Sequence, residues 1–217
     1  FVPRICFVNK MDRVGASYER TIESIRRRLN GNPVPIQLPM GVEAGFHGTI
    51  DLIGGRATVY SNGGKNNSDL NGNEEIPVPP EFEDEYQRYR RTMIEKIVET
   101  DEHLLIRYLE GEDLDEAALR QALRKATIER SLIPVLCGSA MHGKGVHPLL
   151  DAIIYYLPSP ADVPAVEGID PKTDETELRY PDEDGPLAAL AFKVVTDPYV
   201  GRLVFLRVYS GTVRAGA

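Results

Sequence analysis

The first 160 residues alternate short apolar runs with stretches of helical spacing. Residues 5–8 (Ile-Cys-Phe-Val) and 132–137 have the length and β-branched content of buried strands. Each run is followed by a polar loop and then by a helical pattern, from about 16 to 30 and from Val146 onward. The pattern predicts an α/β fold whose loops lie at the carboxyl ends of strands, where such folds bind ligands.

Apolar residues at helical spacing predict which helix faces are buried. The helix at 16–30 repeats Ile22, Ile25 and Leu29, and Asp115 is a suitable N-cap for a later helix. The stripe of that later helix is Leu119, Ala122, Leu123 and Ala126. The last helix repeats Val146, Leu149, Leu150, Ile153, Ile154 and Leu157.

The block from 41 to 113 differs from its flanks, and we interpret it as an insertion with its own small core. Residues 34–38 precede it as a strand, which Pro35 places at a sheet edge or a strand end. Within the block, the pattern at 49–60 predicts a hairpin. The Asn- and Gly-rich composition of 61–73 predicts an exposed, mobile loop. Two helical patterns follow, with apolar residues Tyr86, Met93, Ile94, Ile97, Leu104, Leu105 and Tyr108.

The remaining segments belong to two further regions. Residues 161–186 are acidic and rich in proline, which predicts a linker. From 187 to 217 the pattern changes to strands, which predicts the start of an all-β second domain. Because Phe1 lies in the approach to a strand and Ala217 ends no element, we expect an internal piece of a longer protein.

Composition narrows the class of protein. The chain has 217 residues, 42% of them hydrophobic, enough for one large or two smaller domains. The net charge of −8 argues against a surface devoted to nucleic acid, although a local RNA-facing patch stays open. Cys6 and Cys137 are typical of buried, reduced thiols in a cytosolic protein. The four histidines lack metal-ligand spacing.

The first candidate site follows the first strand and consists of Asn9, Lys10, Met11 and Asp12. Guanine presents two adjacent donors, N1–H and N2–H₂, which one carboxylate accepts together, so Asp12 is the candidate specificity residue. Adenine lacks this pair, and a site left with unpaired polar groups rejects it. Asn9 is suited to tie loops together through its amide. Lys10 can lay its methylene stem across the plane of the base, and Met11 is expected to pack beneath the site.

Ser139 and Ala140 form the candidate second half of the same pocket. Backbone N–H groups in a tight loop behind the strand at 132–137 can point at guanine O6, if the side chains are small. The dipeptide is a weak signal alone and a strong one downstream of Asn-Lys-x-Asp. The inserted block accounts for the long separation between the two halves.

Two other segments resemble phosphate-binding motifs, and we reject both. Residues 138–145 nearly spell Gly-x-x-x-x-Gly-Lys-[Ser/Thr], but Gly145 provides no hydroxyl for Mg²⁺. Asp51 and Gly54 match Asp-x-x-Gly, yet they follow the guanine motif instead of preceding it. Neither segment is therefore expected to bind phosphate.

Further segments surround the guanine motifs: Val-Pro-Arg at 2–4, Asn-Pro-Val-Pro at 32–35, Arg-Lys-Ala-Thr-Ile at 124–128, Tyr-Leu-Pro-Ser-Pro at 156–160 and Thr-Asp-Pro at 196–198. With the motifs, they resemble the elongation factor G family of translational GTPases over nearly the full length. Met141 stands where that family usually has phenylalanine.

The resemblance implies the C-terminal part of a P-loop GTPase domain with an α/β insertion, followed by the first strands of a β-barrel domain. It implies base-recognition residues at 1–40 and 114–160, and an insertion at 41–113 that faces the ribosomal stalk protein. It also implies a cytoplasmic, monomeric GTPase that binds GTP or GDP with Mg²⁺ and the ribosome, including ribosomal RNA, and moves tRNA and mRNA indirectly.

The resemblance implies that the family's phosphate loop and switch regions lie upstream of Phe1, so we expect no catalytic residue and no metal ligand in this chain. The chain alone is therefore expected not to hydrolyse GTP. Two alternatives stay open. One is another translational GTPase, of the ribosome-protection or release-factor type. The other is a non-catalytic ribosome-binding module, which a degraded upstream phosphate loop would indicate.

Overall fold

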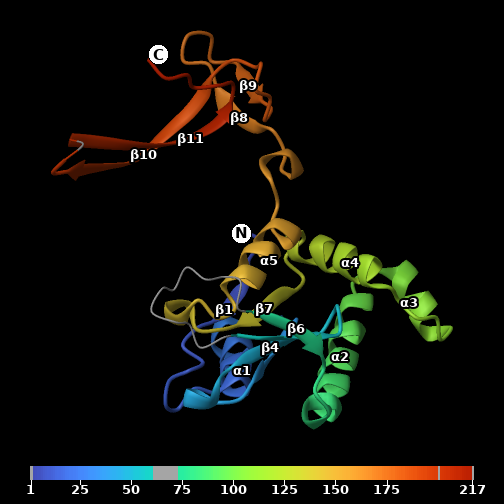
Figure 1. Cartoon of the computed structure of the whole chain (residues 1–217). Helices are drawn as coiled ribbons and strands as arrows, with labels where there is room; N and C mark the ends of the chain where they lie inside the picture. Colours follow the sequence, from blue (N-terminus) through green and yellow to red (C-terminus); the bar gives the residue numbers. More distant parts are fainter. Residues whose placement is uncertain (1, 61–72, 200, 217) are drawn as a thin grey trace. The chain divides into compact units, whose positions relative to one another are not determined.

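The computed structural model describes residues 2–60, 73–199 and 201–216 (Figure 1). The expected loop at 61–73 falls almost entirely outside these ranges. The chain divides into two compact units, Phe1–Leu157 and Pro158–Ala217. Within the described ranges, no helix is long and apolar enough to cross a membrane.

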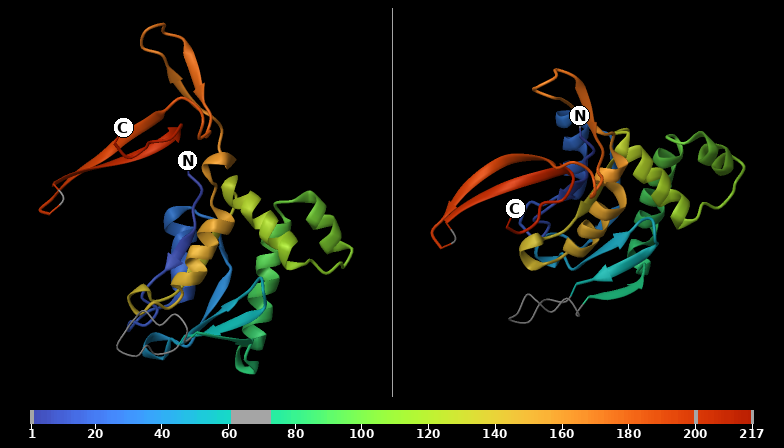
Figure 2. Two further views of the ribbon diagram at one scale, coloured as in Figure 1. Left: turned by 45° about the horizontal axis from the view of Figure 1, so that its top comes forward. Right: turned by 90° about the horizontal axis from the view of Figure 1, so that it is seen from above.

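The first unit contains a three-stranded parallel sheet of order β1-β7-β2. Figure 1 labels β1 and β7 between α5 and α1, and Figure 2 shows the chain from two further directions. Its strands are β1 (Cys6–Val8), β7 (Ile133–Cys137) and β2 (Pro33–Pro35). Every residue of β7 is buried, as expected of a strand paired on both sides. Cys6 pairs with Val135, and Val8 with Cys137, so the two loops that follow β1 and β7 leave the sheet side by side. The two predicted strands are confirmed.

The helix α1 (Tyr18–Leu29) follows β1 and matches its prediction except at the end. Ser17 caps it by accepting a hydrogen bond from the Arg20 N–H, and Asn30 ends it in the left-handed conformation, with φ 47°. Ile22 and Ile25 are buried. Leu29, which the periodicity assigns to the same face, is 65% exposed, so its expected burial is wrong; it lies in the last turn, where the chain leaves the helix.

The predicted strand at 34–38 is two strands in two different sheets. β2 ends at Pro35, and β3 (Gln37–Met40) begins a four-stranded antiparallel sheet of order β3-β4-β5-β6. Ile36 joins them: its N–H donates to Val135 O of the parallel sheet, and its carbonyl accepts from Leu52 N, in the turn just past a strand of the other sheet. The expectation that Pro35 marks an edge and an end is confirmed, because β2 is an edge strand.

The antiparallel sheet continues with β4 (Gly48–Asp51), β5 (Arg56–Val59) and β6 (Glu74–Pro77). The β4–β5 hairpin confirms the predicted one, whereas β6 has no counterpart in the prediction. Helices α2 (Glu83–Val98) and α3 (Glu102–Leu109) follow. The expected separate core is wrong: one continuous cluster contains buried residues of both sheets and of α1, α2 and α4.

The last two helices of the unit differ in how well periodicity predicts them. α4 (Glu116–Ile128) starts at the Asp115 cap, which accepts from Ala118 N, and buries all four predicted residues. α5 (Val146–Tyr156) buries Ala152 and Tyr156 instead of its predicted stripe. Leu150, Ile153 and Ile154 are exposed, so the predicted burial of that face is wrong. Alanine and tyrosine are only moderately apolar, and the periodicity favours the wider aliphatic stripe.

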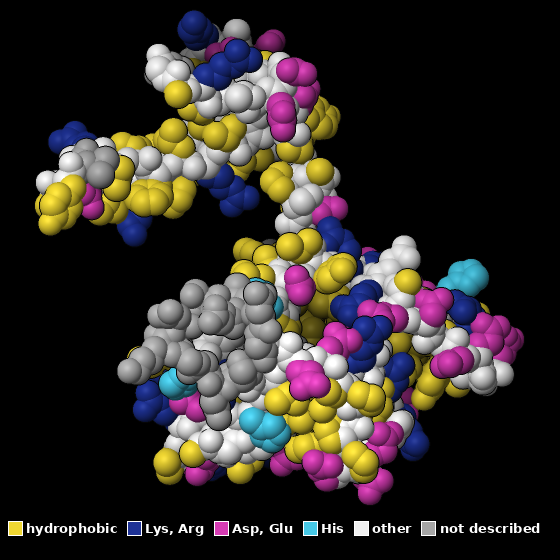
Figure 3. Space-filling view, viewed as in Figure 1, with side chains coloured by type: hydrophobic (Ala, Val, Ile, Leu, Met, Phe, Trp, Pro, Cys, Tyr) yellow, Lys and Arg dark blue, Asp and Glu magenta, His cyan; other side chains and the backbone are white. Residues whose placement is uncertain are grey.

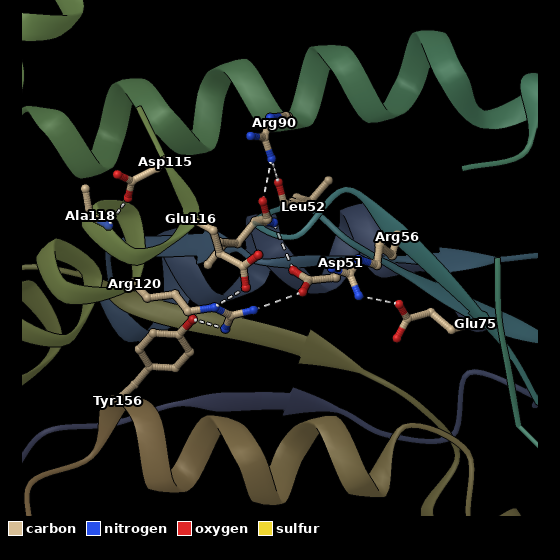
Figure 4. Close-up of polar contacts among 11 residues, drawn as sticks. Asp51, Leu52, Arg56, Glu75, Arg90, Asp115, Glu116, Ala118, Arg120 and Tyr156 are labelled. Carbon is tan, nitrogen blue, oxygen red and sulfur yellow. Dashed lines mark hydrogen bonds and ion pairs between the residues drawn. The ribbon is translucent and has the colours of Figure 1, made fainter. Parts of the chain in front are cut away.

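Arg120 joins three elements of the first unit (Figure 4). From α4 its guanidinium donates to Glu116 Oε1 at 2.7 Å, to Tyr156 OH of α5 at 3.1 Å and to Asp51 Oδ2 of β4 at 3.2 Å. Burial raises the pKa of Tyr156 to about 12, so the hydroxyl stays protonated at neutral pH. Asp51 also caps the hairpin turn by accepting from Ile53 N. Asp51 is therefore a structural residue, consistent with our rejection of it as a phosphate sensor.

Replacing Arg120 with methionine should lower the free energy of unfolding by about 1–3 kcal/mol, because Asp51 and Tyr156 lose a donor at a partly buried position. Urea-induced unfolding measures the change. The matched control is Arg107→Met, which removes an exposed pair with Glu112 and should leave the unfolding midpoint nearly unchanged. Equal losses in the two variants would contradict a special role for Arg120.

The second unit consists of two antiparallel hairpins. β8 (Val166–Ile169) pairs with β9 (Thr176–Arg179), and β10 (Ala188–Asp197) pairs with β11 (Gly201–Ser210). The first hairpin lies inside 161–186, the segment expected to be a linker, and was not predicted, because alternation over only four residues per strand is too short to detect. Apolar side chains are exposed along β10 and β11 (Figure 3), including Leu190, Phe192, Val194, Val204, Phe205 and Leu206.

Candidate guanine-recognition site

Met11 anchors the loop that follows β1. Met11 is 2% exposed, and its backbone N–H donates to Gly138 O at 3.1 Å. Lys10 takes the left-handed conformation, with φ 63°, and is exposed. Burial of Met11 is what its expected packing beneath the site requires. Because Met11 anchors the turn, Lys10 and Asp12 project from a fixed backbone.

Asn9 joins the two halves of the candidate pocket. Its Oδ1 accepts from Lys10 N at 2.8 Å and from Ala140 N at 3.0 Å. The second bond connects residues 131 positions apart along the chain. An amide oxygen has two lone pairs and can accept both donors together. The structure therefore brings the loop after β1 and the loop after β7 into direct contact.

Asp12 lies at the centre of this contact with its side chain 18% exposed. The Ser139 hydroxyl donates to its carboxylate, and this bond is the main cause of a pKa below the usual range; His142 and Arg13 also lower it. Arg13 Nε lies 3.5 Å from the carboxylate, and His142 Nε2 lies 3.6 Å away. Because the folded-state pKa is lowered, the charged form persists at neutral and mildly acidic pH and is lost only as the pH falls through that pKa.

The loop after β7 is short and tightly closed. Ser139 N donates to Lys144 O at 2.9 Å, and Lys144 N donates to Ser139 O at 3.1 Å. Ser139 is 1% exposed, whereas Ala140 opens the short 3₁₀ turn η4 (Ala140–His142) and is exposed. The Lys144 ammonium donates to Phe46 O at 2.9 Å. A backbone pairing of this kind differs from the open cradle of a phosphate loop.

Two glycines let this loop pack against β7. Gly145 has φ 79°, and a Cβ there would lie 2.6 Å from Cys137 O. A Cβ on Gly138 would lie 2.4 Å from Lys144 O and 2.6 Å from the Phe7 ring. All three distances are shorter than any normal contact, so these positions require glycine. The near match to a phosphate loop thus reflects the packing needs of the turn.

The structure brings together most of the predicted base-site residues: Asn9, Met11, Asp12, Ser139 and Ala140. Lys10 lies beside them in the same loop, and its exposed side chain stays at the surface. Sequence reasoning missed Arg13 and His142 as neighbours of Asp12. For Arg13 the adjacency to Asp12 was a usable signal, but the position of His142 depends on how the 3₁₀ turn folds.

No group of three histidine, cysteine, aspartate or glutamate side chains within residues 2–60, 73–199 and 201–216 is arranged to hold a metal ion. These side-chain types therefore offer no ready-made set of ligands in the described ranges for the Mg²⁺ that accompanies GTP in GTPases. What the site offers a ligand is the Asp12 carboxylate and the exposed Lys10, and a carboxylate suits the N–H donors of a base and repels a triphosphate. The Ser139 and Ala140 N–H groups donate to Lys144 O and Asn9 Oδ1.

Comparison with known proteins supports this interpretation. Residues 1–159 match the sequence family described as the elongation factor Tu GTP binding domain. Among solved structures, a protein from Thermus thermophilus is similar over 96% of this chain, with 36% sequence identity and a TM-score of 0.72. The chain spans 27% of that protein's length. Because the family match covers most of the sequence and includes both base loops, the chain belongs to the elongation factor Tu GTP binding domain family, a family of translational GTPases.

Proposed function

We propose that the chain supplies the guanine-recognition half of the GTPase domain of an elongation factor G-type protein, a ribosome-dependent GTPase that drives movement of tRNA and mRNA. The observation that carries the proposal is the bond from Ala140 N to Asn9 Oδ1, which places Asp12 beside Ser139 and Ala140. A family match over 1–159 supports the class, and the segments shared with elongation factor G support the type.

Each residue has a role in this proposal. The Asp12 carboxylate accepts from guanine N1–H and N2–H₂, and the Ser139 hydroxyl holds it ionised and oriented. The Lys10 stem covers the base, whereas the Ser139 and Ala140 N–H groups, which the sequence placed at O6, donate to Lys144 O and Asn9 Oδ1. Met11 supports the loop from below. GTP or GDP is the ligand, and the catalytic groups and Mg²⁺ ligands belong to parts of the GTPase domain outside this chain.

The proposal extends to the setting of the whole protein. Residues 41–113 face the ribosomal stalk protein, residues 187–217 open a β-barrel domain, and the protein is a cytoplasmic monomer that contacts ribosomal RNA. The exposed apolar side chains of β10 and β11 support the second point, because a barrel would cover one face of that hairpin. The chain alone does not turn over GTP.

Competition between nucleotides tests the base assignment in the full-length protein. GDP, inosine diphosphate and ADP would each displace a fluorescent GDP analogue. We expect inosine diphosphate, which lacks the exocyclic N2 donor, to bind about tenfold more weakly than GDP, and ADP about 100-fold more weakly. Equal displacement by ADP would refute guanine recognition. GTP turnover that ribosomes do not stimulate would leave the guanine site intact but favour a different class of GTPase.

A further inference from the structure

The connection between β3 and β4, residues 41–47, touches both halves of the base pocket from the side of the antiparallel sheet. Its Glu43 Oε1 accepts from Gly15 N at 2.7 Å, in the loop that follows Asp12. Its Phe46 carbonyl accepts from the Lys144 ammonium at 2.9 Å, in the loop that carries Ser139 and Ala140. One short segment thus holds two loops that are far apart in sequence.

We propose that residues 41–47 form a clasp that positions both base-recognition loops and slows the release of bound guanine nucleotide. The proposal rests on the proposed guanine site and adds positioning residues to it, Glu43 and Lys144. It also makes nucleotide release depend on the antiparallel sheet, because the clasp is the turn between two of its strands.

The clasp has a fixed conformation of its own. Phe46 is 1% exposed and packs on Tyr60, with ring centroids 6.4 Å apart. Gly41 has φ 80°, and a Cβ there would lie 2.1 Å from Gly45 O. Phe46 N donates to Glu43 O, and His47 N donates to Met40 O. The turn is therefore anchored to the sheet at both ends and presents Glu43 and the Phe46 carbonyl in set positions.

The contact through Lys144 leads directly to the base pocket. Lys144 exchanges two backbone hydrogen bonds with Ser139, whose hydroxyl donates to Asp12. The ammonium also lies 6.0 Å from the centre of the Phe46 ring. Loss of the bond to Phe46 O removes one of the contacts that hold the outer end of the loop, so Ser139 and its bond to Asp12 lose part of their support.

The contact through Glu43 acts on the other half. Gly15 is held on both sides, since its N–H donates to Glu43 and its carbonyl accepts from Arg20 Nη2 at 2.8 Å. Gly15 has φ 81°. Because glycine can adopt many other backbone conformations, this turn can change conformation once the Glu43 carboxylate is removed. Glu43 therefore limits the freedom of the turn that begins at Asp12.

Release of a fluorescent GDP analogue from the full-length protein tests the clasp. Glu43→Ala and Lys144→Met should each speed release by about threefold to tenfold, and the double variant by more, with association within about twofold of the parent. Lys144→Arg, which keeps a cationic donor, should restore slow release. Val42→Ala is the matched control, because that clasp side chain is 70% exposed.

The outcomes separate the clasp from the site on which it rests. Release at the parental rate in the double variant, with guanine preference intact, would overturn the clasp alone. The clasp would also be overturned if Val42→Ala sped release as much as the Glu43 and Lys144 variants do. It would likewise be overturned if a lower melting temperature of those variants accounted for their faster release. A parent protein without guanine preference would show that the proposed function itself had failed.

Discussion

Replacing Asp12 with asparagine is expected to change the preference of the full-length protein from guanine to xanthine nucleotides. In the proposed site the carboxylate accepts two donors of guanine, whereas an amide presents one acceptor and one donor. Xanthine carries a carbonyl in place of the exocyclic amine, so the amide N–H₂ finds an acceptor there. We expect GDP affinity to fall about 100-fold and xanthosine diphosphate affinity to rise by a similar factor.

Equilibrium competition between GDP and xanthosine diphosphate measures this change. Asp151→Asn is the matched control, because Asp151 is exposed on α5 and belongs to neither base loop. Unchanged guanine preference in Asp12→Asn would remove Asp12 from the site. The neighbours of Asp12 also predict a limit: Ser139 can donate to the amide oxygen as it does to the carboxylate, so the variant loop should keep its fold.

A methyl group at Gly145 should have the second large effect. Gly145→Ala places a side chain in the left-handed region, which costs about 1–2 kcal/mol, and forces its Cβ to within 2.6 Å of Cys137 O. Relief of that overlap requires backbone movement, which adds about 1–3 kcal/mol. Because the moving segment carries Ser139 and Ala140, we expect lower stability and, in the full-length protein, at least roughly tenfold weaker GDP binding.

Gly143→Ala is the control that separates the cost of a positive φ from the cost of steric overlap between the new Cβ and its neighbours. Gly143 also has a positive φ, 69°, but nothing lies within 4 Å of the position of its Cβ. It should lose only about 1–2 kcal/mol and keep GDP binding. Urea-induced unfolding and GDP titration of both variants give the comparison. Equal losses at the two positions would show that the close packing against Cys137 is unimportant.

The sequence predicts the elements of this fold best where burial is complete. β7 has apolar neighbours on both sides of the sheet, so its run of apolar residues is unambiguous. The prediction of the buried face of α5 is wrong because Tyr156 is buried and its hydroxyl accepts a hydrogen bond from Arg120. The spacing of apolar residues alone does not reveal such a contact. The β8–β9 hairpin was not predicted because its residues are largely exposed, so the sequence shows no strong alternation of apolar and polar residues there.

The candidate site was predictable because each half combines a short motif with a preceding strand. Asn9 and Asp12 are specified by chemistry that few other residues provide. Glu43, Lys144 and His142 were not predictable as neighbours of the site. Their positions depend on the turn conformations at 41–47 and 138–145 and on tertiary contact between segments distant in sequence, neither of which has a periodic signature.

The order of the strands in the parallel sheet has a consequence for synthesis of the chain. β7 lies between β1 and β2, and the bond that closes the base pocket spans 131 positions. At about 5–20 residues per second, a ribosome needs roughly 7–26 s to add that length. During this time β1 and β2 lack the strand that pairs with both of them, and their unpaired backbone edges are open to mispairing. A nascent chain therefore has a vulnerable interval in which chaperone binding, or the decay of off-pathway contacts, governs the yield of folded protein.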